Sequence, residues 1–198
     1  SSKNAVLELH PNGNLEYLLC DFSVQSQVRT LAEDIRYLLT KWGFNHIDGL
    51  INNAGVYLEK KQMTADGFEM TFAVNHLGQF LLTHQLLSFL QRAENGKVLT
   101  TSSYSHRTTP LNLKRIADPL PYIGLLAYKR SKLCNVLFAY ELNRRFPNIT
   151  AFAVDPGLVN TGIASKGNNG ISDWVWRTRR HKGTLPELPV RTYLYLLS

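Results

Sequence analysis

An alternation of short apolar runs with longer amphipathic segments constrains the fold of this 198-residue chain more than any other feature. The apolar runs have the length of strands and lie at residues 15–20, 47–51, 97–101 and 149–154. The segments with apolar residues at helical spacing are 24–40, 64–90 and 127–145. Strands separated by helices form a parallel sheet with right-handed crossovers. The sequence therefore predicts an α/β fold with a doubly wound parallel sheet between two layers of helices.

Three segments carry more local predictions. The 64–90 region opens at Thr64 to Gly67, and we expect its helix to break between Asn75 and Gly78. The 127–145 helix carries an apolar stripe made of Leu133, Val136, Leu137 and Tyr140. Residues 158–185 contain four glycines and two tryptophans, which indicates a long loop over the ligand-binding edge of the sheet and a role in substrate binding.

Composition excludes several classes of protein. Apolar residues make up 44% of the chain and charged residues 19%, which is typical of a globular protein. No apolar run reaches the 18 residues of a transmembrane helix, and no signal peptide is visible. Cys20 and Cys134 are far apart, which argues against a disulfide framework, and the histidines form no metal-ligand pattern. We therefore expect a cytoplasmic protein without a metal.

The net charge of +7 is unevenly distributed. Residues 1–99 hold 8 basic and 10 acidic residues, whereas residues 100–198 hold 14 and 5. A basic half can attract a phosphorylated cofactor, an anionic membrane surface or a nucleic acid. The densest basic cluster, residues 177–182, follows Trp174 and Trp176, which suggests peripheral contact with a membrane. It lacks any nucleic-acid-binding motif, so we expect no nucleic-acid partner.

Tyr128 and Lys132 are the strongest candidates for catalysis. Four residues of helix turn through about 400°, so the two side chains share one face. A free phenol titrates near pH 10, and a neighbouring ammonium lowers that pKa, so the pair can act as a general acid or base. Ser103 follows a predicted strand and can donate a hydrogen bond to a substrate carbonyl. Taken singly, the pair also fits an exposed surface pair, and Ser102-Ser103 also fits a turn.

Polar and small residues follow the other predicted strands, at the edge where parallel sheets bind ligands. Asp21 can accept from an adenine amino group or a ribose hydroxyl. The Asn52 to Gly55 segment lets a flat ligand approach the backbone. Asn75 lies at the expected helix break, and Pro156-Gly157 ends the last strand, with Thr161 just beyond. Each of these also has a simple interpretation as a turn.

Taken together and in this order, these residues resemble the short-chain dehydrogenase/reductase family. The resemblance covers most of the chain and implies a Rossmann-like, three-layer α/β/α fold. It implies that Tyr128 exchanges the proton at the substrate oxygen, that Lys132 lowers its pKa and holds the nicotinamide ribose, and that Ser103 binds the carbonyl. Asn75 would anchor a water that relays protons to Lys132. The implied cofactor contacts, besides Tyr128 and Lys132, are Asp21, Asn53, Ala54, Gly55, Pro156, Gly157, Val159 and Thr161.

The interval from Ser103 to Tyr128, with the sequence that follows it, is similar to the retinol dehydrogenase-like and WW-domain oxidoreductase-like branch. The branch implies NADP(H), with NAD as the alternative, and a lipophilic carbonyl or alcohol substrate. The family's glycine loop is not found, because no two glycines lie two positions apart. We therefore expect residues 1–198 to be one partial Rossmann domain, a fragment without the first two strands and the last strand.

Without those strands the 15–20 strand has no proper neighbour, and the 47–51 strand becomes an exposed apolar edge. We expect the isolated chain to be poorly stable or to aggregate. The function predicted is hydride transfer between NADP(H) and a carbonyl/alcohol pair. The alternative is a non-catalytic dinucleotide-binding or protein-interaction module derived from such an enzyme. Many members of the family pair through helices that flank the sheet, which makes a homodimer the expected assembly.

Overall fold

The computed structural model describes residues 14–157, 159 and 187–198. Three strands form a parallel sheet in the order β1-β2-β3: β1 (Gly49–Asn52), β2 (Gly96–Thr101) and β3 (Ile149–Val154). Gly49 pairs with Lys97 across β1 and β2, and Gly96 pairs with Ile149 across β2 and β3. The carboxyl ends of all three strands therefore meet at one edge of the sheet. The predicted incomplete α/β Rossmann fold is confirmed.

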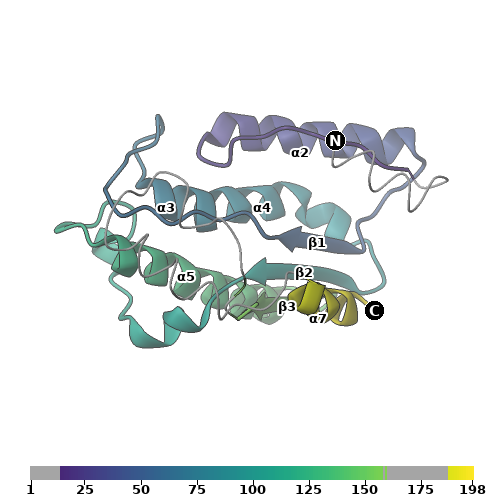
Figure 1. The fold of residues 1–198 in the computed structure, drawn as a ribbon. Coiled ribbons are helices and arrows are strands. Elements are labelled where there is room, and N and C mark those ends of the chain that lie inside the picture. Colours follow the sequence, from purple (N-terminus) through teal and green to yellow (C-terminus); the bar gives the residue numbers. More distant parts are fainter. Residues whose placement is uncertain (1–13, 158, 160–186) are drawn as a thin grey trace.

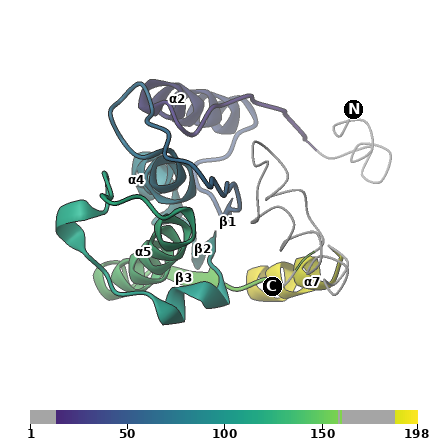
Figure 2. The same ribbon diagram turned by 60° about the vertical axis from the view of Figure 1, so that its left-hand side comes forward.

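The longer helices cover the sheet from two sides. They are α2 (Gln25–Lys41), α4 (Gly78–Leu90), α5 (Gly124–Arg145) and α7 (Glu187–Leu197). Helix α4 lies between α2 and the sheet (Figure 1). Figure 2 shows α4 and α5 on one side of the strands and α7 on the other. No helix in the described residues is long and apolar enough to cross a membrane.

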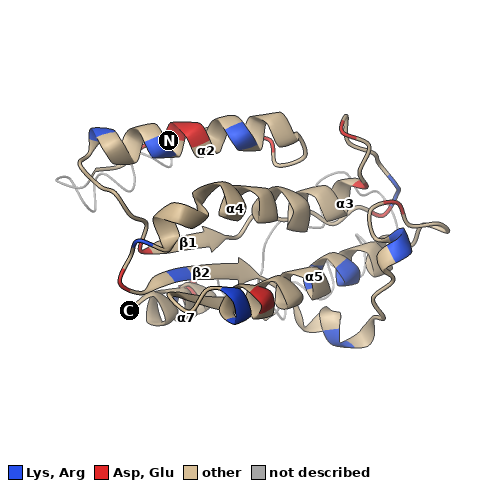
Figure 3. Ribbon diagram, turned by 180° about the vertical axis from the view of Figure 1, so that it is seen from behind, with Lys and Arg blue, Asp and Glu red and all other residues tan. Residues whose placement is uncertain are grey.

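Two apolar clusters hold the α2, α4 and α5 side together. One joins α4, α5 and the strands through Leu90, Val98, Ala139, Leu142, Ile149 and Ala151. The other joins α2 to α4 through Val28, Ala32, Leu81, Leu82 and Leu86. Helix α4 carries no charged residue, and it is tan along its whole length in Figure 3. A helix placed between two packed layers has little surface on which charges could stay hydrated, and the composition of α4 fits that position.

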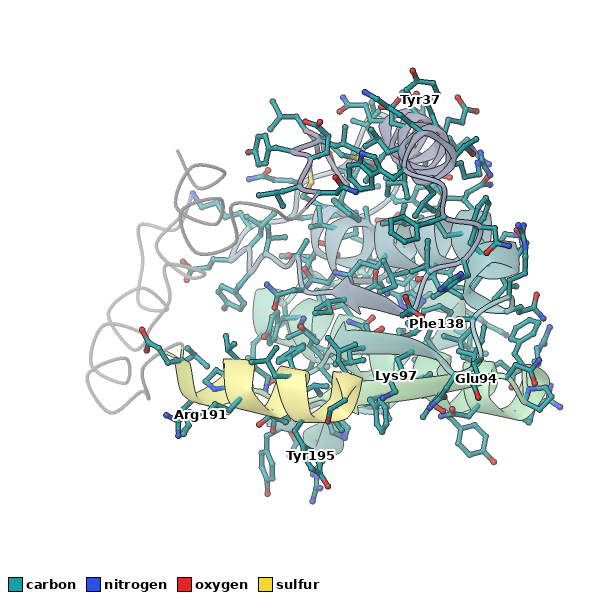
Figure 4. All side chains as sticks on the ribbon, turned by 90° about the vertical axis from the view of Figure 1, so that its right-hand side faces the viewer. Tyr37, Glu94, Lys97, Phe138, Arg191 and Tyr195 are labelled. Atoms are coloured by element: carbon teal, nitrogen blue, oxygen red, sulfur yellow. The ribbon has the colours of Figure 1, made fainter. Side chains whose placement is uncertain are left out.

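Helix α7 is tied to the other face of β2. The Lys97 ammonium donates a hydrogen bond of 2.9 Å to the carbonyl of Leu197, at the C-terminal end of α7, where a cation is favourable (Figure 4). Four residues further along the same face of β2, the Thr101 hydroxyl lies 2.6 Å from the Tyr193 hydroxyl. Alternation along β2 turns Val98 towards α4 and α5 instead.

The predicted strand at 15–20 is wrong: no strand is present in this segment, and Leu19 is 83% exposed. The backbone of a strand needs a neighbouring strand as its hydrogen-bonding partner. Residues 15–20 have none in the described sheet, because β1, the strand at its edge, pairs only with β2. The predicted exposed edge at 47–51 is confirmed, since β1 is that edge and Ile51 is 44% exposed.

The helix predicted from residue 64 starts later. Thr64 to Gly67 forms a turn in which Gly67 has φ +81°, and the helical region begins with α3 (Met70–Phe72). Glu69 caps it by accepting from the backbone N–H groups of Thr71 and Phe72. The predicted break is present as a π-helical turn, η1 (Ala73–Leu77), between α3 and α4.

The apolar stripe predicted for the 127–145 helix faces the core only in part, because two of its residues are exposed. Leu137 is 44% exposed and Tyr140 68% exposed. The buried face of α5 is instead built from small and polar residues that include Ser131, Lys132 and Asn135. These residues carry the candidate site. Two short 3-10 turns, η2 (Tyr104–Thr108) and η3 (Leu113–Arg115), lie between β2 and α5.

Candidate active site

The candidate site lies where the ends of the strands meet η1 and the N-terminal half of α5. Ser103 and Tyr128 act on each other there: the polar Ser103 hydroxyl lowers the pKa of the Tyr128 phenol. Burial acts in the opposite direction and is the larger cause, and the charge of Asp155 adds to it. The net pKa of Tyr128 is raised, and not lowered as the sequence predicts, because burial of the phenol is the largest cause. The phenol is therefore protonated at neutral pH and is in the state of a proton donor.

Lys132 is the largest fully buried side chain among the described residues, with 1% exposure. Its ammonium lies 5.6 Å from the centre of the Tyr128 ring and donates a hydrogen bond of 3.0 Å to the backbone carbonyl of Thr101. Burial lowers its pKa to about 8. A cation this close to a phenol favours the phenolate, so Lys132 can assist proton loss from Tyr128 while it is itself charged.

The two adjacent serines have different surroundings. The Ser102 hydroxyl is buried and donates to the backbone carbonyl of Lys132 at 2.9 Å, which fixes α5 against the end of β2. The Ser103 hydroxyl is half-buried and accepts from the hydroxyl of Ser105 at 3.1 Å. The backbone carbonyl of Ser103 is 2.6 Å from Nδ1 of His106. Of the two hydroxyls, that of Ser103 is the one that acts on the pKa of Tyr128.

Asn75 lies in the π turn and is fully buried. Its side-chain oxygen accepts from the N–H of Val56 at 2.7 Å, and its side-chain nitrogen donates to the carbonyl of Val56 and to the hydroxyl of Ser131, both at 3.0 Å. The Ser131 hydroxyl in turn donates to the carbonyl of Tyr128 at 2.7 Å. Asn75 therefore joins the loop after β1 to the turn of α5 that carries Tyr128.

The loop after β1 holds the candidate cofactor contacts Asn53, Ala54 and Gly55. The Asn53 side chain is exposed and accepts from the Thr101 hydroxyl at 3.1 Å, whereas Ala54 and Gly55 are half-buried. The carbonyl of Ala54 accepts from the side chain of Gln79. Asn52 has a different role, because it is buried and donates to the hydroxyl of Thr83 at 3.0 Å.

The turn after β3 brings Pro156, Gly157 and Val159 to the same end of the sheet. Gly157 has φ +71°, a conformation that favours glycine, and its N–H donates to the carboxylate of Asp155 at 3.0 Å. Val159 is half-buried. Thr161 and the predicted loop 158–185, apart from Val159, lie outside the described residues. Two of these backbone segments, 53–55 and 156–157, leave small or exposed groups at the strand ends, which fits a flat nicotinamide-type group.

Asp21 is not brought into this cluster by any hydrogen bond in the described residues. It is exposed, and its carboxylate accepts from the N–H of Ser23 at 2.8 Å, in the turn before α2. Cys20 and Cys134 are free thiols, and no group of three or more His, Cys, Asp or Glu in the described part of the chain could hold a metal ion.

Sequence reasoning missed the residues that connect the site. The Thr101 hydroxyl hydrogen-bonds the side chains of Asn53 and Tyr193. The Thr101 carbonyl accepts hydrogen bonds from the side chains of Lys132 and Asn135. Asn135 is fully buried one turn beyond Lys132. The position of Thr101 immediately before the two serines was the only signal in the sequence, and nothing in a threonine at a strand end predicts four partners.

Comparison with known proteins fits this geometry. A family model described as short chain dehydrogenase matches residues 2–171. The chain belongs to the short-chain dehydrogenase family. It is 37% identical over 189 residues to human polyprenol dehydrogenase, covering 91% of this chain and 54% of that protein. It is 39% identical over 133 residues to human retinol dehydrogenase 11, covering 66% and 41%. The predicted resemblance to the retinol dehydrogenase-like branch is confirmed.

Solved structures agree at the level of the fold. Levodione reductase matches with a TM-score of 0.70 and 21% identity over 100% of this chain and 75% of that one. A short chain dehydrogenase from Escherichia coli CFT073, solved with NADPH, matches with a TM-score of 0.64 and 19% identity over 99% and 74%. The chain spans about half the length of the curated relatives it matches. Members of this family are oxidoreductases that use NAD(P).

Proposed function

We propose that the protein containing this chain transfers a hydride between NADP(H) and a carbonyl/alcohol pair on a lipophilic substrate. The observation that carries the proposal is the fully buried Lys132 ammonium, 5.6 Å from the centre of the Tyr128 ring, together with the Ser103 hydroxyl that acts on the phenol. These three groups supply a hydrogen-bond donor, a proton donor and a cation at one point of the sheet edge. When bound, the nicotinamide cofactor supplies or accepts the hydride.

In the direction of reduction, the Tyr128 phenol gives its proton to the substrate oxygen and Ser103 donates a hydrogen bond to the same oxygen. The raised pKa of Tyr128 keeps the phenol protonated for this step. The Lys132 ammonium stabilises the phenolate that remains. Asn75 holds the 54–56 loop against α5 and anchors the water that relays protons to Lys132. In the direction of oxidation the same groups act in reverse.

Most of the proposed cofactor contacts are exposed or half-buried groups at the strand ends, whereas Lys132 is fully buried on α5 and Asp21 lies in the turn before α2. Asn53, Ala54 and Gly55 would line its central part, and Pro156, Gly157, Val159 and Thr161 would contact the nicotinamide end. Lys132 and Tyr128 would hold the nicotinamide ribose, and Asp21 would contact the adenine. The preference for NADP over NAD rests on the similarity to the retinol dehydrogenase-like branch, and the basic residues 100–198 are suited to an additional phosphate.

The names of the relatives support a lipophilic alcohol or its carbonyl form as substrate, because polyprenol and retinol are both long apolar alcohols. Trp174, Trp176 and the basic cluster 177–182 support peripheral contact of a cytoplasmic protein with an anionic membrane. Leu137 and Tyr140, exposed on α5, support a homodimer through the helical layer. Co-sedimentation with anionic vesicles and light scattering test these two proposals separately.

The decisive experiment measures oxidation of NADPH and NADH by protein made from the complete coding sequence, with polyprenal, retinal and small aromatic aldehydes. The variant Tyr128→Phe removes only the phenol oxygen, and we expect turnover to fall at least about 100-fold. Tyr140→Phe makes the same change on the exposed face of the same helix and should leave turnover unchanged. Turnover that survives in Tyr128→Phe contradicts the mechanism. Cofactor binding without turnover on any substrate favours the non-catalytic dinucleotide-binding module.

A further inference from the structure

A buried asparagine connects the two halves of the candidate site. Asn135 is fully buried on α5, three residues after Lys132. Its side-chain nitrogen donates one hydrogen bond of 3.0 Å to the backbone carbonyl of Asn75 and another of 3.0 Å to the backbone carbonyl of Thr101. The Lys132 ammonium donates to the same Thr101 carbonyl, also at 3.0 Å. One backbone oxygen therefore receives a neutral donor and a charged donor at once.

The orientation of Asn135 is fixed by a histidine. An amide nitrogen has two hydrogens, and both are used by the two carbonyls, so the amide oxygen is the atom that faces Nδ1 of His76 at 3.0 Å. This oxygen can only accept, so His76 carries a proton on Nδ1. The ring packs among Phe72, Phe80 and Phe138, and burial lowers the pKa of His76, which keeps the imidazole neutral.

We propose that Asn135, held in one orientation by His76, is a positioning residue for the Lys132 ammonium and for the π turn that carries Asn75. This inference rests on the proposed function, in which Lys132 and Asn75 serve Tyr128. By filling one acceptor site of the Thr101 carbonyl, Asn135 leaves Lys132 a single, shared bond there. The other two N–H bonds of the ammonium are left for groups at the reacting end of the site.

The arrangement has a measurable electrostatic consequence. A carbonyl that already accepts from an amide stabilises an ammonium less than a carbonyl with no other donor. Without Asn135, the Thr101 carbonyl is available to Lys132 alone, and the protonated lysine is favoured. Among the described residues, four titratable groups lie near this point. The Tyr128 ring faces Lys132, the Tyr193 hydroxyl lies 2.6 Å from that of Thr101, and the charge of Asp155 acts on both tyrosines. His76 contacts Asn135 itself and is the one group that loses a contact in a variant at residue 135.

The test titrates Lys132 directly, in the complete, cofactor-free protein labelled with carbon-13 at the lysine ε-carbon. The Lys132 signal is assigned by its loss in Lys132→Met. In Asn135→Leu, which keeps the volume and removes both donors, we expect the titration midpoint of Lys132 to rise by about one pH unit. An unchanged or lowered midpoint overturns the proposal. The core substitution Leu142→Val on the same helix controls for general loosening and should leave the midpoint unchanged.

A second pair of variants keeps the test decisive if Asn135→Leu does not fold. His76→Asn places an amide N–H near the position of Nδ1 and should keep the wild-type midpoint, whereas His76→Leu should raise it. Equal midpoints in these two variants overturn the role of His76. With a substrate in hand, the pH profile of kcat should move with the Lys132 midpoint. If no substrate is turned over, the proposed function fails, and the titration still decides the role of Asn135.

Discussion

Replacing the buried lysine with methionine should make the cofactor-free protein more stable at neutral pH. Lys132 is 1% exposed, and its pKa falls from 10.5 to about 8 because burial disfavours the charged form. Below pH 8 the folded state must hold a poorly solvated charge that the unfolded state keeps in water. Lys132→Met removes that charge and keeps the length of the side chain.

The magnitude follows from the change in pKa. At 1.36 kcal/mol per unit, the drop from 10.5 to about 8 corresponds to a penalty of about 3 kcal/mol at pH 7. The substitution also loses the hydrogen bond to the Thr101 carbonyl, worth about 1 kcal/mol, but that oxygen keeps its bond from Asn135. We therefore expect Lys132→Met to raise the free energy of unfolding by about 2 kcal/mol at pH 7, while turnover is lost.

The dependence on pH has a definite sign. Between pH 8 and 10.5 the unfolded state binds more protons at this lysine than the folded state, so the stability of the wild type rises with pH across this window. The extra free energy of unfolding of Lys132→Met over the wild type should therefore decrease from pH 8 upwards and change sign at about pH 10. Below pH 8 the difference should be constant.

Urea unfolding followed by tryptophan fluorescence, from pH 6.5 to 10.5, measures this difference in the complete, cofactor-free protein. Lys129→Met, at a half-buried position on the same helix, controls for the exchange of side chains outside the site. A Lys132→Met protein that is less stable than the wild type at pH 7, by an amount that does not vary with pH, would refute the reasoning.

Three further predictions follow from the structure. Glu69→Ala leaves the buried N–H of Thr71 and the part-buried N–H of Phe72, at the start of α3, without an acceptor. It should lower the free energy of unfolding by about 3 kcal/mol, with Glu69→Gln closer to the wild type, and thermal unfolding compares the two. In Gly78→Ala the new Cβ would lie 2.6 Å from the backbone carbonyl oxygen of Phe22. This variant should lose about 1–3 kcal/mol of the free energy of unfolding and therefore unfold at a lower urea concentration. An unchanged urea midpoint would show that the Phe22 segment can shift without cost. The isolated 198-residue chain should aggregate through the exposed edge strand β1, and Ile51→Lys should slow the rise in light scattering. Equal rates of aggregation in the wild type and the variant would show that another surface drives the association.

The order of elements was predictable because it depends on local pattern. The run at 149–154 is β3 residue for residue, and the helices at 24–40 and 127–145 differ from α2 and α5 by one to three residues at their starts. The strand at 15–20 was wrong for a nonlocal reason. Apolar alternation gives a segment the ability to form a strand, but only a neighbouring strand with free hydrogen-bonding groups makes it one.

For the candidate site, the sequence determined which chemical groups are present and at which strand ends they stand. Tyr128 and Lys132 share a helix face by spacing alone, and Ser103 follows a strand whose carboxyl end meets the others. The tertiary structure decided the environment of each group. Three features depend on contacts between segments about 30 residues apart. They are the burial of Lys132, the different surroundings of Ser102 and Ser103, and the two hydrogen bonds that Lys132 and Asn135 donate to the Thr101 carbonyl. The pKa values follow from those contacts, because desolvation and hydrogen bonding belong to the packed site and not to the residue type.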